Sequence, residues 1–431
     1  MIYLHVPFCG SFCTYCDFYS EICRDARAFN EYADAVVAEI LDRRNELSMN
    51  MSAPSAVRTL YVGGGTPSVL PLSVLRRIVE TLRLVAAESV AGTEPIPVTE
   101  YVPVAELVEA SGLRVGKVAS TGSVTERRAT TERSAAGRNS AADAAGSFLE
   151  FTVEVNPEGI VEKGSEYVSG LIALGVNRIS MGVQSFDDGI LHWMNRRHDA
   201  AGAEKAFRIL RECGIKNISI DLIFGLSQLT DEMWEDTVRK ALDLSPEHIS
   251  AYQLSIEDGS ALARMAADGR YVEASEDQCR RQYDILCRTL AKAGYRHYEI
   301  SNFAKPGFEA VHNSAYWSRT PYVGLGPGAH SLNGDVRSWN TQTLPHRRPD
   351  GVLETYSRDS ERLFEEDVRI ERIMLPLRTD FGLKADELYS LVAPSTVDAL
   401  LDEGALLRIG DRIRIPEDHF FTSDEIIREL V

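Results

Sequence analysis

The feature that most constrains the fold is an alternation of β-rich apolar segments with helical patterns along the first two-thirds of the chain. Strands are expected at residues 2–6, 59–62, 149–155, 178–183, 218–224 and 248–254. Helical patterns lie between several of them, at 72–85, 200–213 and 232–244. Strands connected through helices form right-handed crossovers and a parallel sheet. We therefore expect an α/β fold built as a partial (β/α)6 barrel, with the chemistry at the carboxyl ends of the strands.

Composition supports a packed core and excludes some classes of function. Hydrophobic residues make up 44% of the 431 residues, and 64 acidic against 46 basic residues give a net charge of −18. An acidic surface repels phosphate backbones, so we expect no nucleic-acid partner. The first residues, MIYLHVPFCG, lack the basic segment of a signal peptide, and no apolar run reaches the roughly 20 residues of a membrane span. We expect a cytoplasmic protein without a transmembrane segment.

The barrel region, residues 1–300, is interrupted by an insertion at about 87–147. Most residues from 119 to 147 are Ala, Ser, Thr or Gly. Such a composition buries too little apolar surface to offset chain entropy, so this insertion is expected to be disordered. A separate region, residues 301–356, follows the barrel.

The last region, residues 357–431, has a different pattern. Helices are expected at 371–377 and 385–391, and a hairpin at 405–416 that turns at Gly410. This arrangement predicts a small winged-helix-like α+β domain. Its acidic residues outnumber its basic ones, so contact with the barrel or with a protein is expected rather than contact with DNA.

Three of the seven cysteines, Cys9, Cys13 and Cys16, follow the first strand with C-x3-C-x2-C spacing. An odd, clustered set of cysteines is not typical of a disulfide framework. Thiolates so close on one loop suit a 4Fe-4S cluster with one iron left open. A zinc site and a purely structural trio are the alternatives, and zinc lacks a fourth cysteine at the usual spacing.

Other strand ends carry groups suited to binding a ligand. Gly63, Gly64 and Gly65 precede Thr66 and let a ligand approach backbone N–H groups closely. Glu154 and Asp221 lie in apolar strand contexts, where an unpaired carboxylate is costly, so a bound partner is expected.

The motifs HVPFC-x3-C-x-YCDF and GGGTPS resemble the radical S-adenosylmethionine (SAM) superfamily. More narrowly, the chain is similar to the branch that contains anaerobic coproporphyrinogen III dehydrogenase and the heme chaperone HemW. Matching segments at 151–157, 178–186, 220–225 and 298–303 extend the likeness to the whole chain except the insertion.

This resemblance implies that Cys9, Cys13 and Cys16 hold a 4Fe-4S cluster and that the chain binds SAM. The implied SAM contacts are Tyr3, Tyr15, Gly64, Gly65, Thr66, Glu154, Gln184, Arg196 and Asp221. The family usually has glycine where this chain has Asn195. No catalytic residue is assigned.

Two features of the sequence count against the dehydrogenase branch. Phe18 stands where that enzyme typically carries a fourth cysteine, and with Tyr3 so near the start we expect the enzyme's long N-terminal extension to be missing. Conversely, His312, Asn313, Tyr316 and Trp317 match the HN-x-x-Y-W motif of the heme chaperone.

The matched motif makes those side chains candidates for heme binding, with His312 as iron ligand and His330 or a cysteine next in line. The structural alternative is that Tyr316 and Trp317 pack the seam beside the barrel and that His312 is hydrogen-bonded there.

The resemblance favours a heme chaperone that delivers heme to apo-hemoproteins, among them those of the respiratory chain, and that uses an electron donor. The alternatives are an oxygen-independent coproporphyrinogen III dehydrogenase of porphyrin biosynthesis and another radical-SAM enzyme.

Overall fold

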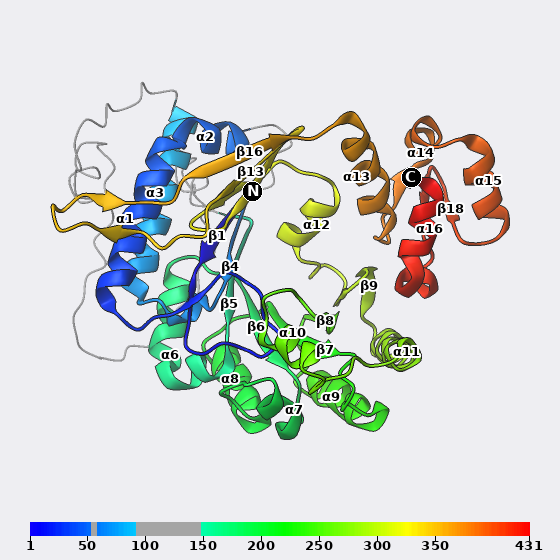
Figure 1. The fold of residues 1–431 in the computed structure, drawn as a ribbon, viewed down its shortest axis with the longest axis horizontal. Helices are drawn as coiled ribbons and strands as arrows, with labels where there is room; N and C mark the ends of the chain where they lie inside the picture. Colours follow the sequence, from blue (N-terminus) through cyan, green and yellow to red (C-terminus); the bar gives the residue numbers. More distant parts are fainter. Residues whose placement is uncertain (53–57, 92–147) are drawn as a thin grey trace, which may run out of the picture.

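The computed structural model describes residues 1–52, 58–91 and 148–431 (Figure 1). Most of the insertion expected at 87–147 therefore lies outside the described residues. Its first residues, 87–91, are an exception, because they belong to helix α3 (Leu72–Ala91). The insertion was expected to start at about residue 87, but α3 continues through residue 91, so this expected start was wrong by about one helical turn.

A central sheet contains the strands expected from the sequence, all parallel and adjacent in chain order. They are β1 (Ile2–Val6), β4 (Thr59–Gly64), β5 (Glu150–Val155), β6 (Arg178–Gln184), β7 (Ile218–Phe224) and β8 (His248–Gln253). Most of their residues are buried, as in a parallel sheet covered on both faces. The α/β fold expected from the alternating pattern is confirmed.

The sheet has nine strands in the order β11-β1-β4-β5-β6-β7-β8-β10-β9. At one edge, β11 (Val323–Leu325) is parallel to β1. At the other edge, β10 (Asn302–Ala304) pairs antiparallel with β8, and β9 (Arg296–Glu299) pairs antiparallel with β10. The sequence did not predict these edge strands, which are short.

Helices pack around the parallel strands (Figure 1). They are α1 (Ala26–Asp42), α2 (Arg44–Ser52), α3, α6 (Pro157–Ala173), α7 (Asp188–Trp193), α8 (Ala200–Glu212), α9 (Asp231–Asp243), α10 (Ala261–Ala267) and α11 (Glu276–Lys292). Side chains of Asp199, Thr230 and Ser275 accept backbone N–H bonds at the starts of α8, α9 and α11. Such N-caps satisfy donors that the first turn leaves free.

Helix α12 (Val311–Trp317) follows β10 in the chain and precedes β11. The chain therefore passes through α12 from one edge of the sheet to the other. The helix contacts the amino-terminal ends of β4 and β5 through Thr59 and Glu150. It lies at the end of the parallel strands opposite to their carboxyl ends.

After β11 the chain forms two small antiparallel sheets. One has the order β12-β13-β16, from β12 (His330–Asn333), β13 (Val336–Asn340) and β16 (Arg358–Arg362). The other pairs β14 (His346–Arg347) with β15 (Leu353–Glu354). Because β16 pairs with β13, the first residues after the boundary proposed at 357 share a sheet with the preceding region.

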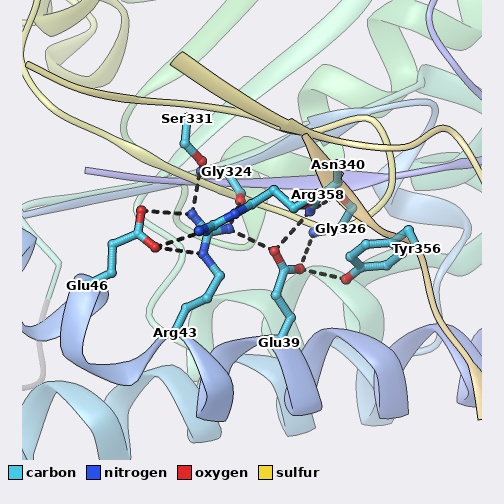
Figure 2. A network of polar contacts seen from close by, with 9 residues as sticks. All are labelled: Glu39, Arg43, Glu46, Gly324, Gly326, Ser331, Asn340, Tyr356 and Arg358. Atoms are coloured by element: carbon cyan, nitrogen blue, oxygen red, sulfur yellow. Dashed lines mark hydrogen bonds and ion pairs between the residues drawn. The ribbon is translucent and has the colours of Figure 1, made fainter. Parts of the chain in front are cut away.

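A polar network fastens this part of the chain to α1 and α2 (Figure 2). Arg43 is buried, donates to the carbonyl of Gly324 at 2.6 Å and to Ser331 Oγ at 3.0 Å, and pairs with Glu39 and Glu46. Glu39 also accepts hydrogen bonds from Asn340 Nδ2, the Tyr356 hydroxyl and the Gly326 N–H, and Arg358 pairs with Glu46. These contacts hold the segment around β11 beside β1.

The C-terminal part has helices and a small antiparallel sheet, as expected. The helices are α13 (Glu365–Leu377), α14 (Ala385–Leu391), α15 (Pro394–Asp402) and α16 (Ser423–Leu430). The sheet has the order β17-β19-β18, from β17 (Leu383–Lys384), β18 (Leu407–Ile409) and β19 (Arg412–Arg414). The hairpin turns at Gly410, whose φ is 61°. Helices α15 and α16 were missed.

Within the described part of the chain, none of the helices combines the length and the apolar character that a bilayer crossing needs.

Candidate functional site

A cavity of about 870 Å³ opens at the carboxyl ends of the parallel strands. Most of the cluster and SAM residues expected from the sequence line it together: Cys9, Cys13, Tyr15, Cys16, Gly64, Gly65, Thr66, Glu154, Gln184, Arg196 and Asp221. Tyr3 is not among the lining residues. Its hydroxyl instead bonds His5 Nδ1 at 3.1 Å. One site thus gathers side chains that are more than 200 positions apart in the sequence.

The loop that carries the three cysteines is held by the end of α7. Thr14 donates its backbone N–H to the Met194 carbonyl at 3.1 Å and its hydroxyl to the Trp193 carbonyl at 2.9 Å. Asn195 Nδ2 donates to the Phe12 carbonyl at 2.7 Å. Asn195 also has a φ of 58°, which asparagine tolerates better than most side chains. Its place at a position where the family usually has glycine therefore has a physical explanation.

Arg196 connects the cysteine loop to the strand ends. Its guanidinium donates to Cys13 Sγ at 3.4 Å, to Asn156 Oδ1 at 2.9 Å and to the Gly182 carbonyl at 2.5 Å. Asn156 donates in turn to Thr66 Oγ1 at 3.2 Å, and the Thr66 hydroxyl donates to Cys9 Sγ at 3.5 Å. Two of the three cysteines therefore belong to one hydrogen-bonded network.

The glycine run lies too close to the first strand for any side chain. A Cβ at Gly64 would come within 2.6 Å of the His5 ring, and one at Gly65 within 2.6 Å of the Phe8 carbonyl oxygen. The N–H groups of Gly65 and Thr66 donate to the carbonyls of Val6 and Phe8 at 2.8 and 2.7 Å. These glycines thus fix the turn against the cysteine loop, a structural role beside the close ligand approach expected from the sequence.

Glu154 and Asp221 place two carboxyl groups in the cavity wall. Burial raises the pKa of Glu154 to about 7, although hydrogen bonds from the Tyr61 hydroxyl and the Gly64 N–H act to lower this pKa. Burial also raises the pKa of Asp221, whose carboxylate accepts bonds from the hydroxyls of Ser180 and Ser219. A cationic partner favours the ionised form of such buried carboxyls.

Gln184 has a φ of 69° at a register shift between β6 and β7. A left-handed backbone conformation is costly for residues other than Gly, Asn and Asp, and it is typical of functional sites. A Cβ at neighbouring Gly182 would meet Gln184 Nε2 at 2.9 Å, so the two residues are closely packed beside Arg196.

Two of the three cysteine thiols have a raised pKa. Burial raises the pKa of Cys9 and raises that of Cys16 to about 12. Thiols of this kind are deprotonated by coordinating iron. Among the described residues, no group of three His, Cys, Asp or Glu side chains converges on one metal position.

The HN-x-x-Y-W motif lies away from the cysteine loop, on α12. Of its residues only Asn313 lines the cavity. His312 is buried, with Nδ1 bonded to Thr59 Oγ1 at 2.7 Å and Nε2 to the Tyr316 hydroxyl at 2.9 Å. Both ring nitrogens are occupied, so His312 is not available to iron in this structure. Tyr316 and Trp317 are half-buried, which agrees with the structural alternative.

Sequence reasoning missed several residues of the site. Tyr61, Asn156 and Tyr252 line the cavity. Asn156 was detectable, because it follows Glu154 at the end of the same strand. Tyr61 reads from the sequence as an ordinary strand residue, and only its bond to Glu154 identifies it.

Comparisons with known proteins agree with this geometry. The profile of the Radical SAM superfamily matches residues 3–241. The heme chaperone HemW of Lactococcus lactis is 29% identical over 100% of this chain and 96% of its own length. HemW of Bacillus subtilis is 29% identical over 80% of this chain and 74% of its own length, and that of Mycobacterium tuberculosis 27% over 100% and 94%. The resemblance expected from the motifs is confirmed.

Among solved structures, the coproporphyrinogen III oxidase HemN of Escherichia coli matches 99% of this chain and 89% of its own, with a TM-score of 0.69 and 20% identity. At that identity the match shows the fold alone.

Proposed function

The chain belongs to the radical SAM superfamily, and from this premise we propose that it is a heme chaperone with a 4Fe-4S cluster and a SAM site. The observation that carries the proposal is the shared cavity, which gathers three cysteines, a half-buried arginine and two half-buried carboxyls. The names of the HemW relatives supply the heme part. The partners proposed are apo-hemoproteins, among them respiratory ones, and an electron donor.

The cluster part assigns Cys9, Cys13 and Cys16 as iron ligands. Arg196 Nη1 lies 3.4 Å from Cys13 Sγ, and the Thr66 hydroxyl lies 3.5 Å from Cys9 Sγ. Hydrogen bonds to the sulfurs stabilise thiolates and tune a cluster. When bound, a cluster of this kind supplies the electron for reductive cleavage of SAM.

The SAM part assigns the remaining cavity groups. The carboxyls of Glu154 and Asp221 can pair with an ammonium group or accept bonds from ribose hydroxyls. Arg196 can pair with a carboxylate, and it is held in place by Asn156 and the Gly182 carbonyl. Tyr15, Gln184, Gly64, Gly65 and Thr66 complete the proposed contacts. Tyr3 is proposed to act from outside the cavity, through His5.

For heme, we assign the iron ligand to His330 in place of His312. The ring nitrogens of His5, His198, His248, His297 and His312 pair with other groups in the protein interior. His330 is exposed on β12, and its ring stacks on Trp339 across the β12–β13 pair, with centroids 6.0 Å apart. Partial desolvation and the charge of Arg337 lower the pKa of its imidazole, which favours the neutral ring that can bind iron.

Anaerobic reconstitution tests the cluster. We expect iron–sulfur absorbance and about four irons per chain, both lost when Cys9, Cys13 and Cys16 are changed to Ala. The matched control is the triple variant of Cys213, Cys279 and Cys287, which should keep its iron. Full iron content in the first variant would end the cluster assignment.

Heme titration of the same protein tests heme binding and the assignment of His330 as the iron ligand. We expect a Soret band that weakens in His330→Ala and persists in His312→Ala. Absence of heme uptake by the wild-type protein contradicts the chaperone proposal. A Soret band that depends on His312 would restore the motif as the ligand.

A second candidate is an oxygen-independent coproporphyrinogen III dehydrogenase, and the observation in its favour is the fold shared with HemN. Against it, Phe18 lines the cavity with 64% of its surface exposed, where that enzyme typically has a cysteine. Anaerobic incubation with coproporphyrinogen III and SAM separates the two, because protoporphyrinogen formation would favour the dehydrogenase.

A further inference from the structure

We propose that the helix carrying the HN-x-x-Y-W motif positions the SAM site: His312 holds the ring of Tyr61, whose hydroxyl orients the carboxyl group of Glu154. This inference rests on the proposed function only for the statement that Glu154 contacts SAM. It gives the motif a role that neither the cluster nor heme ligation requires.

The first step is that α12 is fixed to the base of the parallel strands. The buried carboxylate of Glu150, the first residue of β5, accepts the N–H of Val311 at 2.8 Å and that of His312 at 3.0 Å. The Ala310 N–H donates to the Tyr298 hydroxyl at 3.3 Å. The start of the helix therefore cannot shift without breaking buried hydrogen bonds.

The second step is that the His312 ring has one orientation. It is 1% exposed, and Thr59 and Tyr316 occupy its two nitrogens. Burial lowers the pKa of this imidazole to about 3, so it stays neutral across the physiological range. Because both of its nitrogens are bonded, the neutral His312 ring is held in one orientation and offers a fixed surface for packing.

The third step is contact between this fixed surface and the cavity wall. The ring centroids of His312 and Tyr61 are 5.2 Å apart, with the planes at 33°. Tyr61 also packs against Tyr3, with centroids 6.2 Å apart. The Tyr61 hydroxyl then donates to Glu154 Oε1 at 2.7 Å, while the Gly64 N–H donates to Oε2 at 3.2 Å.

Glu154 thus takes its orientation from two donors, and one of them depends on α12. The hydrogen bond from Tyr61 favours the ionised carboxylate against the effect of burial. Other ionisable or charged groups also act on Glu154 or are affected by it: Asp221, Arg178, Tyr3 and Tyr252. None of these four groups has a described hydrogen bond to Glu154, whereas Tyr61 has one.

The test compares Tyr61→Phe and His312→Ala with wild type and with Tyr322→Phe. Tyr322 packs on Tyr316, with centroids 4.8 Å apart, and has no described contact with Tyr61, so it is a matched control. Infrared difference titration of the carboxyl band, assigned through its loss in Glu154→Gln, reports the Glu154 midpoint on SAM-free protein.

We expect a midpoint near 7 in wild type and Tyr322→Phe, and a higher midpoint in Tyr61→Phe and in His312→Ala. The affinity for SAM should fall about tenfold in both variants, the effect of losing roughly 1.4 kcal/mol, while iron content stays unchanged. Unchanged midpoints in both variants overturn the inference. If only Tyr61→Phe shifts, the role of His312 is overturned.

If the proposed SAM site is wrong, the result differs from the one expected when only the positioning role of α12 is wrong. Wild-type protein that binds no SAM contradicts the assignment of the SAM site, yet the midpoints still decide whether α12 positions Glu154.

Discussion

At the scale of the residue, Glu154 combines the binding role proposed for it with a cost in stability. Its pKa is about 7 in the folded protein because of burial, against about 4.5 for an exposed carboxyl group. A carboxyl whose folded pKa is raised holds its proton more tightly when folded. Ionising it therefore destabilises the fold, and this loss grows as pH rises from about 4.5 to 7 and then levels off.

Glu154→Gln removes that cost, so the variant should be more stable than wild type in the absence of SAM. The gain is expected to be small at pH 4.5 and to reach at most about 3 kcal/mol above pH 7. Denaturant unfolding of cluster-loaded protein at several pH values measures it. Affinity for SAM should fall in the same variant. A stability difference that does not depend on pH would contradict the raised pKa.

Asn195 is the second residue whose backbone carries a prediction. Its φ of 58° costs a residue with an ordinary side chain about 1–2 kcal/mol, and glycine nothing. Asn195→Ala should therefore lower the free energy of unfolding by about that amount beyond the effect of Asn195→Gly. Both substitutions lose the bond to the Phe12 carbonyl, so their difference isolates the backbone term. Equal unfolding energies would disprove it.

At the scale of the element, the sequence predicted those strands whose bounds follow from a local pattern of apolar residues. Strands β1 and β7 match their expected bounds because a buried parallel strand is a continuous apolar run between turns. The cavity followed, since the carboxyl ends of such strands meet at one edge. The edge strands β9, β10 and β11 were missed because three or four residues carry no clear period.

The docking of α12 was not predictable in the same way. His312 bonds Thr59 across 253 positions of sequence, and no local signal encodes that partner. The sequence offered ligation and packing as alternatives for this motif, and only the occupied ring nitrogens distinguish them.

The segment between α3 and β5 carries a prediction of its own. Deleting residues 119–147 should leave iron content and heme uptake unchanged, because closure entropy varies slowly with loop length. Iron analysis and the Soret band of the shortened protein check this. Loss of the cluster, or insoluble protein, would show that the segment has a structural role.

At the scale of the whole molecule, the Arg43 network joins the first helices to the chain after β11. Arg43 pairs with Glu39 and Glu46, and its side chain is only 5% exposed. Arg43→Met leaves the largely buried Glu39 carboxylate without its ion-pair partner and leaves Glu46 with Arg358 alone. We expect a loss of about 3–5 kcal/mol of unfolding free energy.

The matched control is Arg239→Met, which breaks exposed pairs with Asp236 and Asp243. It should cost at most about 1 kcal/mol, since exposed ion pairs contribute little. Comparable losses in the two variants, measured by denaturant unfolding, would mean that the network does not fasten the molecule.

Delivery of heme to another protein is the central property proposed here, and one measurement tests it most directly. Protein loaded with heme is mixed anaerobically with an apo-hemoprotein that has a distinguishable holo spectrum, and the transfer of the Soret band is followed over time. We expect the acceptor to gain heme as the donor loses it, faster than from an equal concentration of heme held by serum albumin. Heme that stays on the protein, or transfer no faster than from albumin, would contradict a chaperone function.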